Sequence, residues 1–265
     1  MTNQTNVVAE TVHYKIEQIE KLAIIKFKPD SPIEELYKLE NIGQFFSVDL
    51  NKLLGKEITT RLFLFTDNIF SEERFNEFIK TIKIDPDEKI NFLTDKNNLR
   101  FNALDRFTNI KHRFIKDCLE SDKLNIFAHN GSSIGLWLST ILSGDYSIVA
   151  ENSQFTFPFL EDDILPLGGL IYYLDKYVSK AALDELLLLG KPINSDDLLK
   201  WGLVNKVVNG DTIEQDAIKI ALEISNKSHF FIQRFKHFKH RLNGRLLESL
   251  DLEHEIYSGG GLRRF

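Results

Sequence analysis

Cysteine is nearly absent from this sequence: Cys118 is the only one among 265 residues. A single thiol cannot form an intramolecular disulfide, and it excludes a cysteine-rich metal site. Cys118 falls in the apolar pattern of an expected helix, so we expect a buried thiol. No apolar run approaches 18 residues, and the first fifteen residues contain no apolar signal core. These absences favour a cytoplasmic protein that does not enter a membrane.

Positively charged residues are outnumbered by negatively charged ones. Lys and Arg number 33 against 39 Asp and Glu, which gives a formal net charge of −6. Proteins that bind nucleic acid more often present a basic face, so we do not expect a nucleic-acid partner. One basic cluster near the C-terminus has two interpretations, a solvated helix face or a contact with phosphate. It consists of Arg234, Lys236, His237, Lys239, His240 and Arg241.

Apolar residues make up 43% of the chain and include 21 phenylalanines, which predicts an aromatic-rich core. The hydrophobic pattern alternates between strands and helices and then becomes helical only. This order predicts an α/β core followed by a C-terminal helical part. The expected strands are two within 11–28 with a turn near Glu20, then 58–66, 124–128, 146–150, 154–157 and 204–208. The expected helices are 46–54, 103–121, 134–142, 168–178, 180–189, 195–201, 211–227 and 229–242.

The most informative segment is HNGSSIGLW, residues 129–137. A strand ends there, the chain turns on Gly131, and a helix begins at about Gly135. The first amides of a helix have no intrahelical partner and carry the positive end of the helix dipole. An oxygen that develops negative charge can be stabilised at such a place. The alternative is an ordinary strand-turn-helix connection, because isolated glycine patterns are weak signals.

Several segments resemble the crotonase (enoyl-CoA hydratase/isomerase) superfamily, most strongly within 123–208. Residues 130–158 resemble the family's Asn-Gly, glycine-led helix, Asp, strand and Phe-x-x-Pro run. Residues 164–208 resemble the following block, with its Pro-x-Gly-Gly turn and its Gly-Leu-Val strand start. Residues 62–75 resemble the strand and Phe-Ser turn, and 228–239 resemble the C-terminal helix. The resemblance implies a crotonase-like ββα spiral core over 1–208 and a helical trimerisation region over 209–265.

The resemblance also implies a site. An oxyanion hole would use the backbone amides of Leu136 and of Ser71 (or its neighbour Glu72). Gly135 and Lys236 would contact coenzyme A or phosphopantetheine, which belongs to the substrate and is not a separate cofactor. The implied partners are an acyl-CoA or an acyl carrier protein, and further copies of the chain in a trimer or hexamer. No metal is implied.

The family's catalytic acids are missing from the matching positions. Ser139 and Phe159 stand where the two glutamates of hydratases stand, and Leu167 stands at a third acidic position that some members use. A phenylalanine cannot transfer a proton, and an unassisted serine is a poor base at neutral pH. Hydration by the two-glutamate mechanism is therefore not expected.

Other ionisable residues lie near the matching positions. Asp162 and Asp163, with Glu161, follow the second glutamate position. They form either a solvated acidic turn or a displaced general base with a raised pKa. His129, at the end of a strand, is expected to have a structural role because a lone histidine carries no spacing signal.

Three functions remain open. In the first interpretation, the chain is an enzyme of the enoyl-CoA hydratase/isomerase type, a lyase or isomerase with non-standard catalytic residues. Alternatively, it decarboxylates an acyl thioester, like the superfamily decarboxylases of polyketide β-branching, which also lack both glutamates. In the third interpretation it binds acyl-CoA without turnover. The sequence does not give the acyl group, the carrier or the direction of the reaction.

Overall fold

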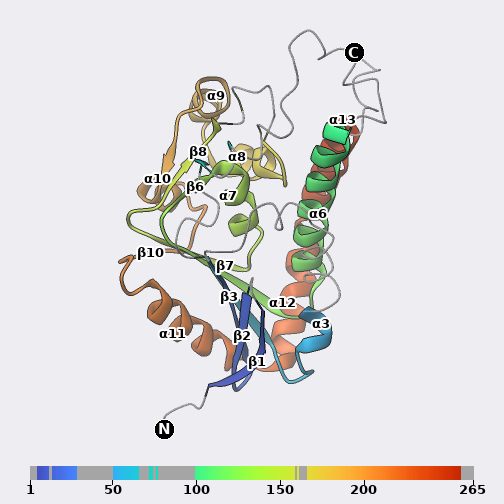
Figure 1. The fold of residues 1–265 in the computed structure, drawn as a ribbon, viewed down its shortest axis with the longest axis vertical. Helices are drawn as coiled ribbons and strands as arrows, with labels where there is room; N and C mark the ends of the chain where they lie inside the picture. The colour runs from blue at the N-terminus through green and yellow to red at the C-terminus, as the bar shows by residue number, and fades with distance from the viewer. Residues whose placement is uncertain are drawn as a thin grey trace.

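The computed structural model describes residues 5–11, 14–28, 50–65, 72–73, 76, 99–158, 160 and 166–257. Within them, two sheets and a set of helices form an α/β structure (Figure 1). The calls for Ser71, Phe159, Glu161, Asp162 and Asp163 fall outside these residues. No helix in the described part of the chain is long and apolar enough to cross a membrane.

The larger sheet has seven strands in the order β1-β2-β3-β4-β5-β7-β10. The first three strands pair antiparallel, and all the later pairs are parallel. Glu20 has a φ of 51° at the β2–β3 turn, where the sequence predicts a turn. The strands are β1 (Asn6–Glu10), β2 (Tyr14–Ile19), β3 (Leu22–Phe27), β4 (Thr60–Phe65), β5 (Leu124–His129), β7 (Tyr146–Ala150) and β10 (Lys206–Val208).

Both faces of the larger sheet are covered, and strand β4 shows how. Its side chains alternate with the period of two that a pleated strand imposes. Leu62 and Leu64 join an apolar cluster with helix α11 (Ile213–Ser225). Phe63 and Phe65 point into the main core, where their rings stack on Phe127 at 4.9 and 5.8 Å between centroids. The predicted aromatic-rich core is confirmed.

A smaller sheet carries the chain from the end of β5 into helix α7 (Gly135–Leu142). Strand β6 (Ser132–Ile134) pairs parallel with β8 (Gln154–Thr156), and β8 pairs antiparallel with β9 (Ile193–Asn194). Because β6 ends at Ile134, its pairing with β8 fixes where the first turn of α7 begins. The smaller sheet therefore positions the candidate site.

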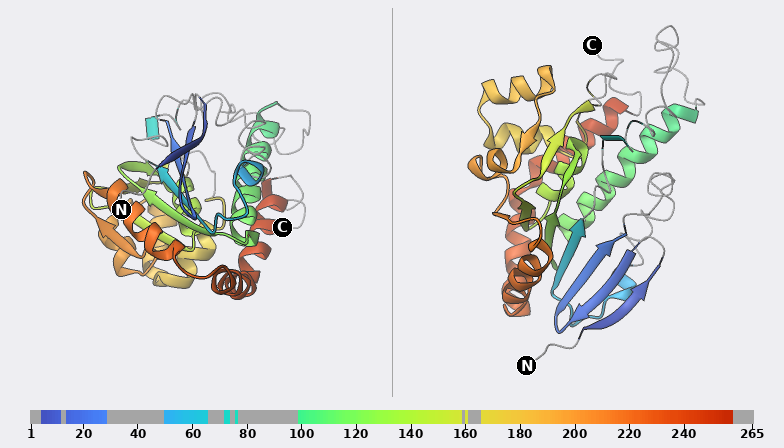
Figure 2. Two further views of the ribbon diagram at one scale, coloured as in Figure 1. Left: turned by 90° about the horizontal axis from the view of Figure 1, so that it is seen from below. Right: turned by 60° about the vertical axis from the view of Figure 1, so that its left-hand side comes forward.

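Three helices lie together along one side of the molecule: α6 (Leu99–Glu120), α12 (His229–Leu242) and α13 (Gly244–Tyr257). Figure 2 shows α12 and α13 following α6, although they come more than a hundred residues later in the chain. The remaining helices are α3 (Leu50–Leu53), α8 (Leu170–Tyr177), α9 (Lys180–Leu189) and α10 (Ser195–Lys200).

The predicted elements agree with these bounds to within a few residues, and Cys118 is buried as expected. The sequence did not indicate β1, β6 or β9, and it covered α13 only as part of the helical region over 209–265. The proposed division at residue 208 stays a prediction: α11 packs on the larger sheet, whereas α12 and α13 pack against α6. Trimerisation through the C-terminal helices stays a prediction too.

Candidate functional site

Helix α7 begins without a side-chain cap. Its N-cap residue Ile134 is extended, with φ −77° and ψ 148°, and its side chain accepts no hydrogen bond from the first turn. Amides of the first helical turn have no intrahelical acceptor. Leu136 belongs to this turn and is buried in the main core. The structure therefore places an amide donor at a buried, positively polarised helix end.

Gly135 has a packing role in this arrangement. A Cβ added there would lie 2.4 Å from Cε1 of Phe157, a distance that real side chains do not tolerate. The absence of a side chain lets the Phe157 ring lie directly against the helix start. The implied contact of Gly135 with the ligand stays a prediction.

Two of the positions at which the resemblance implies an acid lie in the described residues, and both are fully buried. Leu167 is part of the main core. Ser139 lies one turn after Leu136 and its hydroxyl donates to the Leu136 carbonyl at 2.9 Å. That hydrogen bond ties the Ser139 hydroxyl to the backbone of its own helix. Because the two residues are a serine and a leucine, neither position offers a carboxylate.

Lys111 on α6 reaches the same place. A Cβ built on Gly168 would lie 2.3 Å from Cε of Lys111 and 2.6 Å from Oγ of Ser139. The two side chains therefore meet at this glycine. The side chain is buried and its Nζ has no hydrogen-bond partner among the described residues. Burial lowers the pKa of Lys111 to about 7, while the negative charge of Glu253 opposes that shift. A buried amine thus lies beside Ser139, the position that the resemblance aligns with a glutamate.

Sequence reasoning missed Lys111, although a signal was present. Lys111 follows Phe107 by four residues and precedes Ile115 by four, so it occupies the apolar face of its helix. A lysine at core spacing is unusual because lysine is almost never fully buried without a partner. The spacing alone could not show which residues pack against Lys111.

Glu253 on α13 fixes the Gly168-Gly169 turn. Its two carboxylate oxygens accept from the amides of Gly168 and Gly169 at 2.7 and 2.9 Å, and Oε2 also accepts from His112 Nε2 at 2.8 Å. Both glycines have positive φ, 75° and 74°, which side-chain-bearing residues rarely adopt. Glu253 therefore holds the backbone against which Lys111 lies.

Lys236 on α12 is buried, and its ammonium group lies in the protein interior. Its Nζ donates to the Cys118 carbonyl at 2.7 Å and to Asp145 Oδ2 at 2.9 Å. The same Asp145 oxygen accepts from the Asn125 amide at 2.9 Å. Lys236 thus links α12 to the core, and the phosphate contact that the resemblance implies for it stays a prediction.

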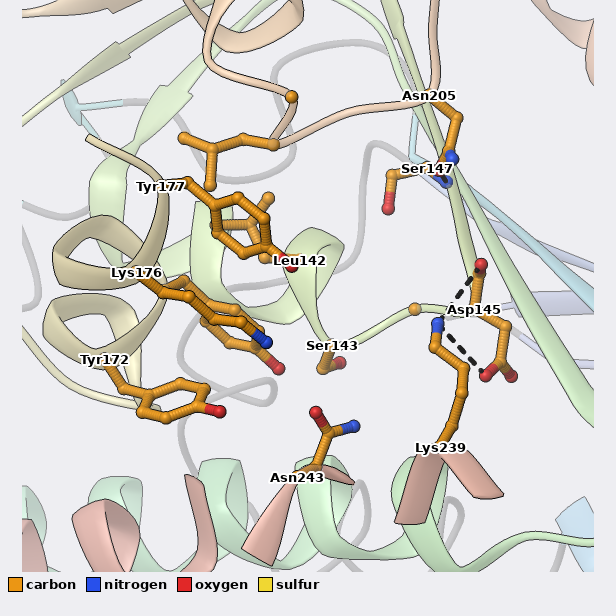
Figure 3. Close-up of a pocket in the computed structure, with 14 residues that line it drawn as sticks. Leu142, Ser143, Asp145, Ser147, Tyr172, Lys176, Tyr177, Asn205, Lys239 and Asn243 are labelled. Carbon is orange, nitrogen blue, oxygen red and sulfur yellow. Dashed lines mark hydrogen bonds and ion pairs between the residues drawn. The ribbon is translucent and has the colours of Figure 1, made fainter. Parts of the chain in front are cut away.

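A polar cavity of about 160 Å³ lies at the far end of α7 (Figure 3). Lys176 comes to it from α8 and Lys239 from α12. Lys239 Nζ lies 3.4 Å from the Asp145 carbonyl oxygen and 3.6 Å from Oδ1. Burial lowers the pKa of Lys239, and Asp145 opposes that shift. Leu142, which lines this cavity, follows Leu136 by six residues on α7, so the two lie about 9 Å apart along the helix at 1.5 Å per residue.

His129 lies at the end of β5 and is buried. Its Nε2 donates to the Gly131 carbonyl at 3.1 Å, and its ring lies 5.1 Å from the Phe155 ring. Burial lowers the pKa of His129 to about 4, so the ring is neutral at physiological pH. This geometry agrees with the expected structural role. Among the described residues, no group of three or more His, Cys, Asp or Glu could hold a metal ion.

Comparison with known proteins places the described geometry in context. The family model described as "Enoyl-CoA hydratase/isomerase" matches residues 93–259. A carnitinyl-CoA dehydratase from Salmonella typhi is 28% identical over 122 residues, which is 46% of this chain and 47% of that protein. The match thus spans about half the length of the curated relatives.

Solved structures match most of the chain. An enoyl-CoA hydratase from Bacillus halodurans has a TM-score of 0.71 at 17% identity, covering 95% of this chain and 94% of its own. A methylmalonyl-CoA decarboxylase in complex with 2-nitronate-propionyl-CoA has a TM-score of 0.65 at 19% identity, covering 94% and 91%. At such low identity these likenesses show the fold, and they confirm the α/β spiral fold predicted from the sequence.

Proposed function

The chain belongs to the enoyl-CoA hydratase/isomerase family, and from this premise we propose that it binds an acyl thioester and stabilises the thioester enolate. The ligand is an acyl-CoA or an acyl carrier protein. Its thioester oxygen lies at the start of α7, where it accepts from the Leu136 amide. The observation that supports this proposal is the uncapped, buried first turn of that helix.

The physical reason lies in the surroundings of this amide. Charge that develops on an oxygen is stabilised most by donors fixed in a buried environment, where they need not reorganise. Gly135 and Phe157 hold the start of α7 in place by close packing. The second donor that the resemblance implies, Ser71, completes the hole in this proposal.

Ordinary two-glutamate hydration is not part of the proposal, because Ser139 and Phe159, which the resemblance aligns with the two glutamates, supply no carboxylate. We expect crotonyl-CoA hydration to be slower than in a two-glutamate enzyme by at least the 10²–10⁴-fold that one positioned acid or base contributes, roughly. Coupled spectrophotometric assays of hydration test this. Hydration at an ordinary enzyme rate would show that the catalytic positions have been misassigned.

A second candidate is decarboxylation of a malonyl-type thioester, which the same observation favours. Loss of CO₂ generates the enolate directly, so the site needs the oxyanion hole and a proton donor but no carboxylate base. Release of CO₂ from malonyl-CoA or methylmalonyl-CoA separates this candidate from isomerisation of a β,γ-enoyl-CoA. Acyl-CoA binding without turnover on either class would favour the non-catalytic interpretation.

The oxyanion hole is tested with two variants of one residue. Leu136→Pro removes the amide proton in the first helical turn, where proline is tolerated, and Leu136→Ala keeps the amide while also removing the large side chain. The measurement is the carbonyl stretching frequency of isotope-labelled crotonyl-CoA bound to each protein. We expect a lowered frequency in wild type and Leu136→Ala, and a loss of that shift in Leu136→Pro.

Circular dichroism establishes that both variants are folded, and calorimetry establishes that both are saturated with ligand. A carbonyl frequency that is equally lowered in folded, saturated Leu136→Pro would remove this amide from the site. Failure of wild type to bind any acyl-CoA or acyl carrier protein would overturn the proposed function as a whole.

A further inference from the structure

We propose that the amine of Lys111 is the group that transfers protons to and from the α-carbon of the thioester held at Leu136. This inference rests on the proposed function and assigns a residue to it. It would replace the carboxylate that the family places at the position of Ser139 with an amine that comes from a different helix.

The first argument is position. Lys111 Cε and Ser139 Oγ lie 2.3 and 2.6 Å from the position that a Cβ on Gly168 would take. Ser139 is hydrogen-bonded to the carbonyl of Leu136, the residue whose amide would receive the thioester oxygen. The lysine chain therefore ends near the Ser139 hydroxyl, which is itself hydrogen-bonded to the first turn of α7.

The second argument is the state of the amine. Lys111 is only 5% exposed, yet its Nζ has no hydrogen-bond partner among the described residues. An unpartnered buried amine costs stability, and folding alone gives no reason to retain it. A bound ligand that presents an acidic C–H or an enolate would give this amine a partner.

The third argument is that the neighbouring ionisable groups are occupied. Glu253 faces the lysine from α13, but its oxygens already accept from two backbone amides and from His112. Helix α7 contributes Ser139 on this side, and the Pro166–Gly169 turn contains no ionisable side chain. Within the described part of the chain, the proton acceptor that remains uncommitted here is the Lys111 amine.

The electrostatics suit proton transfer in both directions. Burial disfavours the ammonium form and lowers the pKa of Lys111 to about 7, and Glu253 prevents a further fall. Near neutral pH both the amine and the ammonium are then populated. A group with a pKa near the working pH is the most effective general acid or base.

The step is a proton exchange without any co-reactant. The neutral amine takes a proton from the α-carbon, and the C–H electron pair becomes the enolate double bond as negative charge moves to the thioester oxygen. The Lys111 ammonium then returns a proton to the α-carbon and regenerates the thioester. In D₂O the ammonium exchanges its protons with solvent, so the returned particle is a deuteron.

The experiment follows deuterium uptake at the α-carbon of butyryl-CoA by NMR in D₂O, with binding measured in parallel by calorimetry. Lys111→Met removes the amine, and Lys111→Arg keeps a long cationic side chain that does not release its proton in this pH range. Lys123→Met is the matched control, because Lys123 is also buried but pairs with Asp122.

We expect both Lys111 variants to bind butyryl-CoA as wild type does and to lose about 10²–10⁴-fold in exchange rate, the contribution of one positioned acid or base. Lys123→Met should exchange at the wild-type rate. In wild type the exchange rate should rise with pH to a plateau above about pH 7, as the amine deprotonates. This profile keeps the proposal testable even if both variants fail to fold.

The outcomes separate the two proposals. Unchanged exchange in folded Lys111→Met, or wild type that binds butyryl-CoA without any exchange, overturns the role of Lys111 and leaves thioester binding standing. A wild-type exchange rate whose pH dependence shows no inflection near pH 7 also overturns the role of Lys111. Absence of acyl-CoA binding in wild type overturns the proposed function itself.

Discussion

At the scale of single residues, the structure brings a buried amine close to Ser139. Ser139, which the resemblance aligns with a glutamate of the family, is hydrogen-bonded to its own helix. Lys111 comes from α6 to the same place. Gly135 and Gly168 permit the close packing there, because each leaves space that a neighbouring side chain fills.

The buried amine should make stability depend on pH. The folded-state pKa of Lys111 is about 7 against an ordinary value of 10.5, so between these values the unfolded state binds more protons. The unfolding free energy of wild type, relative to Lys111→Met, should therefore fall as pH drops from about 10 to 7, by about 1.4 kcal/mol per unit. Urea titrations of both proteins across this range measure the difference. A difference that does not vary with pH would show that the amine keeps its ordinary pKa.

Gly135 gives a prediction about packing. Gly135→Ala places a Cβ 2.4 Å from Cε1 of Phe157, so overpacking should destabilise the fold by about 1–3 kcal/mol. The double variant Gly135→Ala/Phe157→Leu should recover part of that loss, because the ring that clashes is gone. Thermal unfolding of the two single variants and the double variant measures the recovery. Strictly additive losses would contradict the close approach of the ring.

At the scale of elements, α12 is joined to the core through a buried ion pair. Lys236 reaches across to Asp145 and to the end of α6, where Cys118 supplies its carbonyl. Lys239, one turn further along α12, reaches the same aspartate from the polar cavity. The two lysines of one helix therefore have different surroundings.

Loss of the buried partner should destabilise the protein. Lys236→Met leaves the Asp145 carboxylate without its closest cation, which should cost about 3 kcal/mol. Asp145→Asn should cost a comparable amount, and the double variant should cost less than the two single changes together. Denaturant titration of the three proteins gives the coupling. Additive costs would mean that the pair contributes nothing beyond its separate members.

The phosphate contact of α12 should come from Lys239 and not from the buried Lys236. Because Lys239 lines a cavity together with Lys176, Lys239→Glu should weaken coenzyme A binding, and more at low salt than at high salt. Calorimetry at two ionic strengths measures both effects. Gln233→Glu, on the same helix but with an exposed side chain outside the cavity, is the control. Affinity that Lys239→Glu leaves unchanged at low salt would remove this cavity from the ligand site.

At the scale of the whole molecule, α12 presents an exposed apolar face. The side chains on it recur at helical spacing, and Phe238 and Leu242 are 70% and 74% exposed. Such a face on a protein in water normally marks an interaction site. The residues of this face are Phe231, Phe235, Phe238 and Leu242.

The resemblance to a trimeric or hexameric family suggests that further copies of the chain cover this face. Light scattering of the wild type should give a mass that is a multiple of the 30.7 kDa chain. Phe238→Asp should shift the mass towards the single chain, because a buried charge at an interface is costly. Gln215→Asp on the exposed side of α11 makes the same charge change and should leave the mass unaltered. A wild type that is monomeric would contradict this assembly.

The sequence by itself determined most of the elements and the start of the candidate site. Its apolar alternation predicts the strands of the larger sheet, and the HNGSSIGLW segment predicts the turn and the start of α7, because such signals act between neighbouring residues. The resemblance carried by the same segment predicts the family. Helix α13 was covered only by the general prediction of a helical region over 209–265, and Glu253 was not considered.

Only the tertiary structure decided what surrounds Ser139. Glu253 binds the amides of Gly168 and Gly169 from about 85 residues away in the sequence, and Lys111 reaches the same turn from another helix. Likewise, the resemblance implies a ligand contact for Lys236, and only the fold shows that its ammonium pairs with Asp145. Contacts of this kind depend on how helices pack, and local patterns in a single sequence carry no information on that packing.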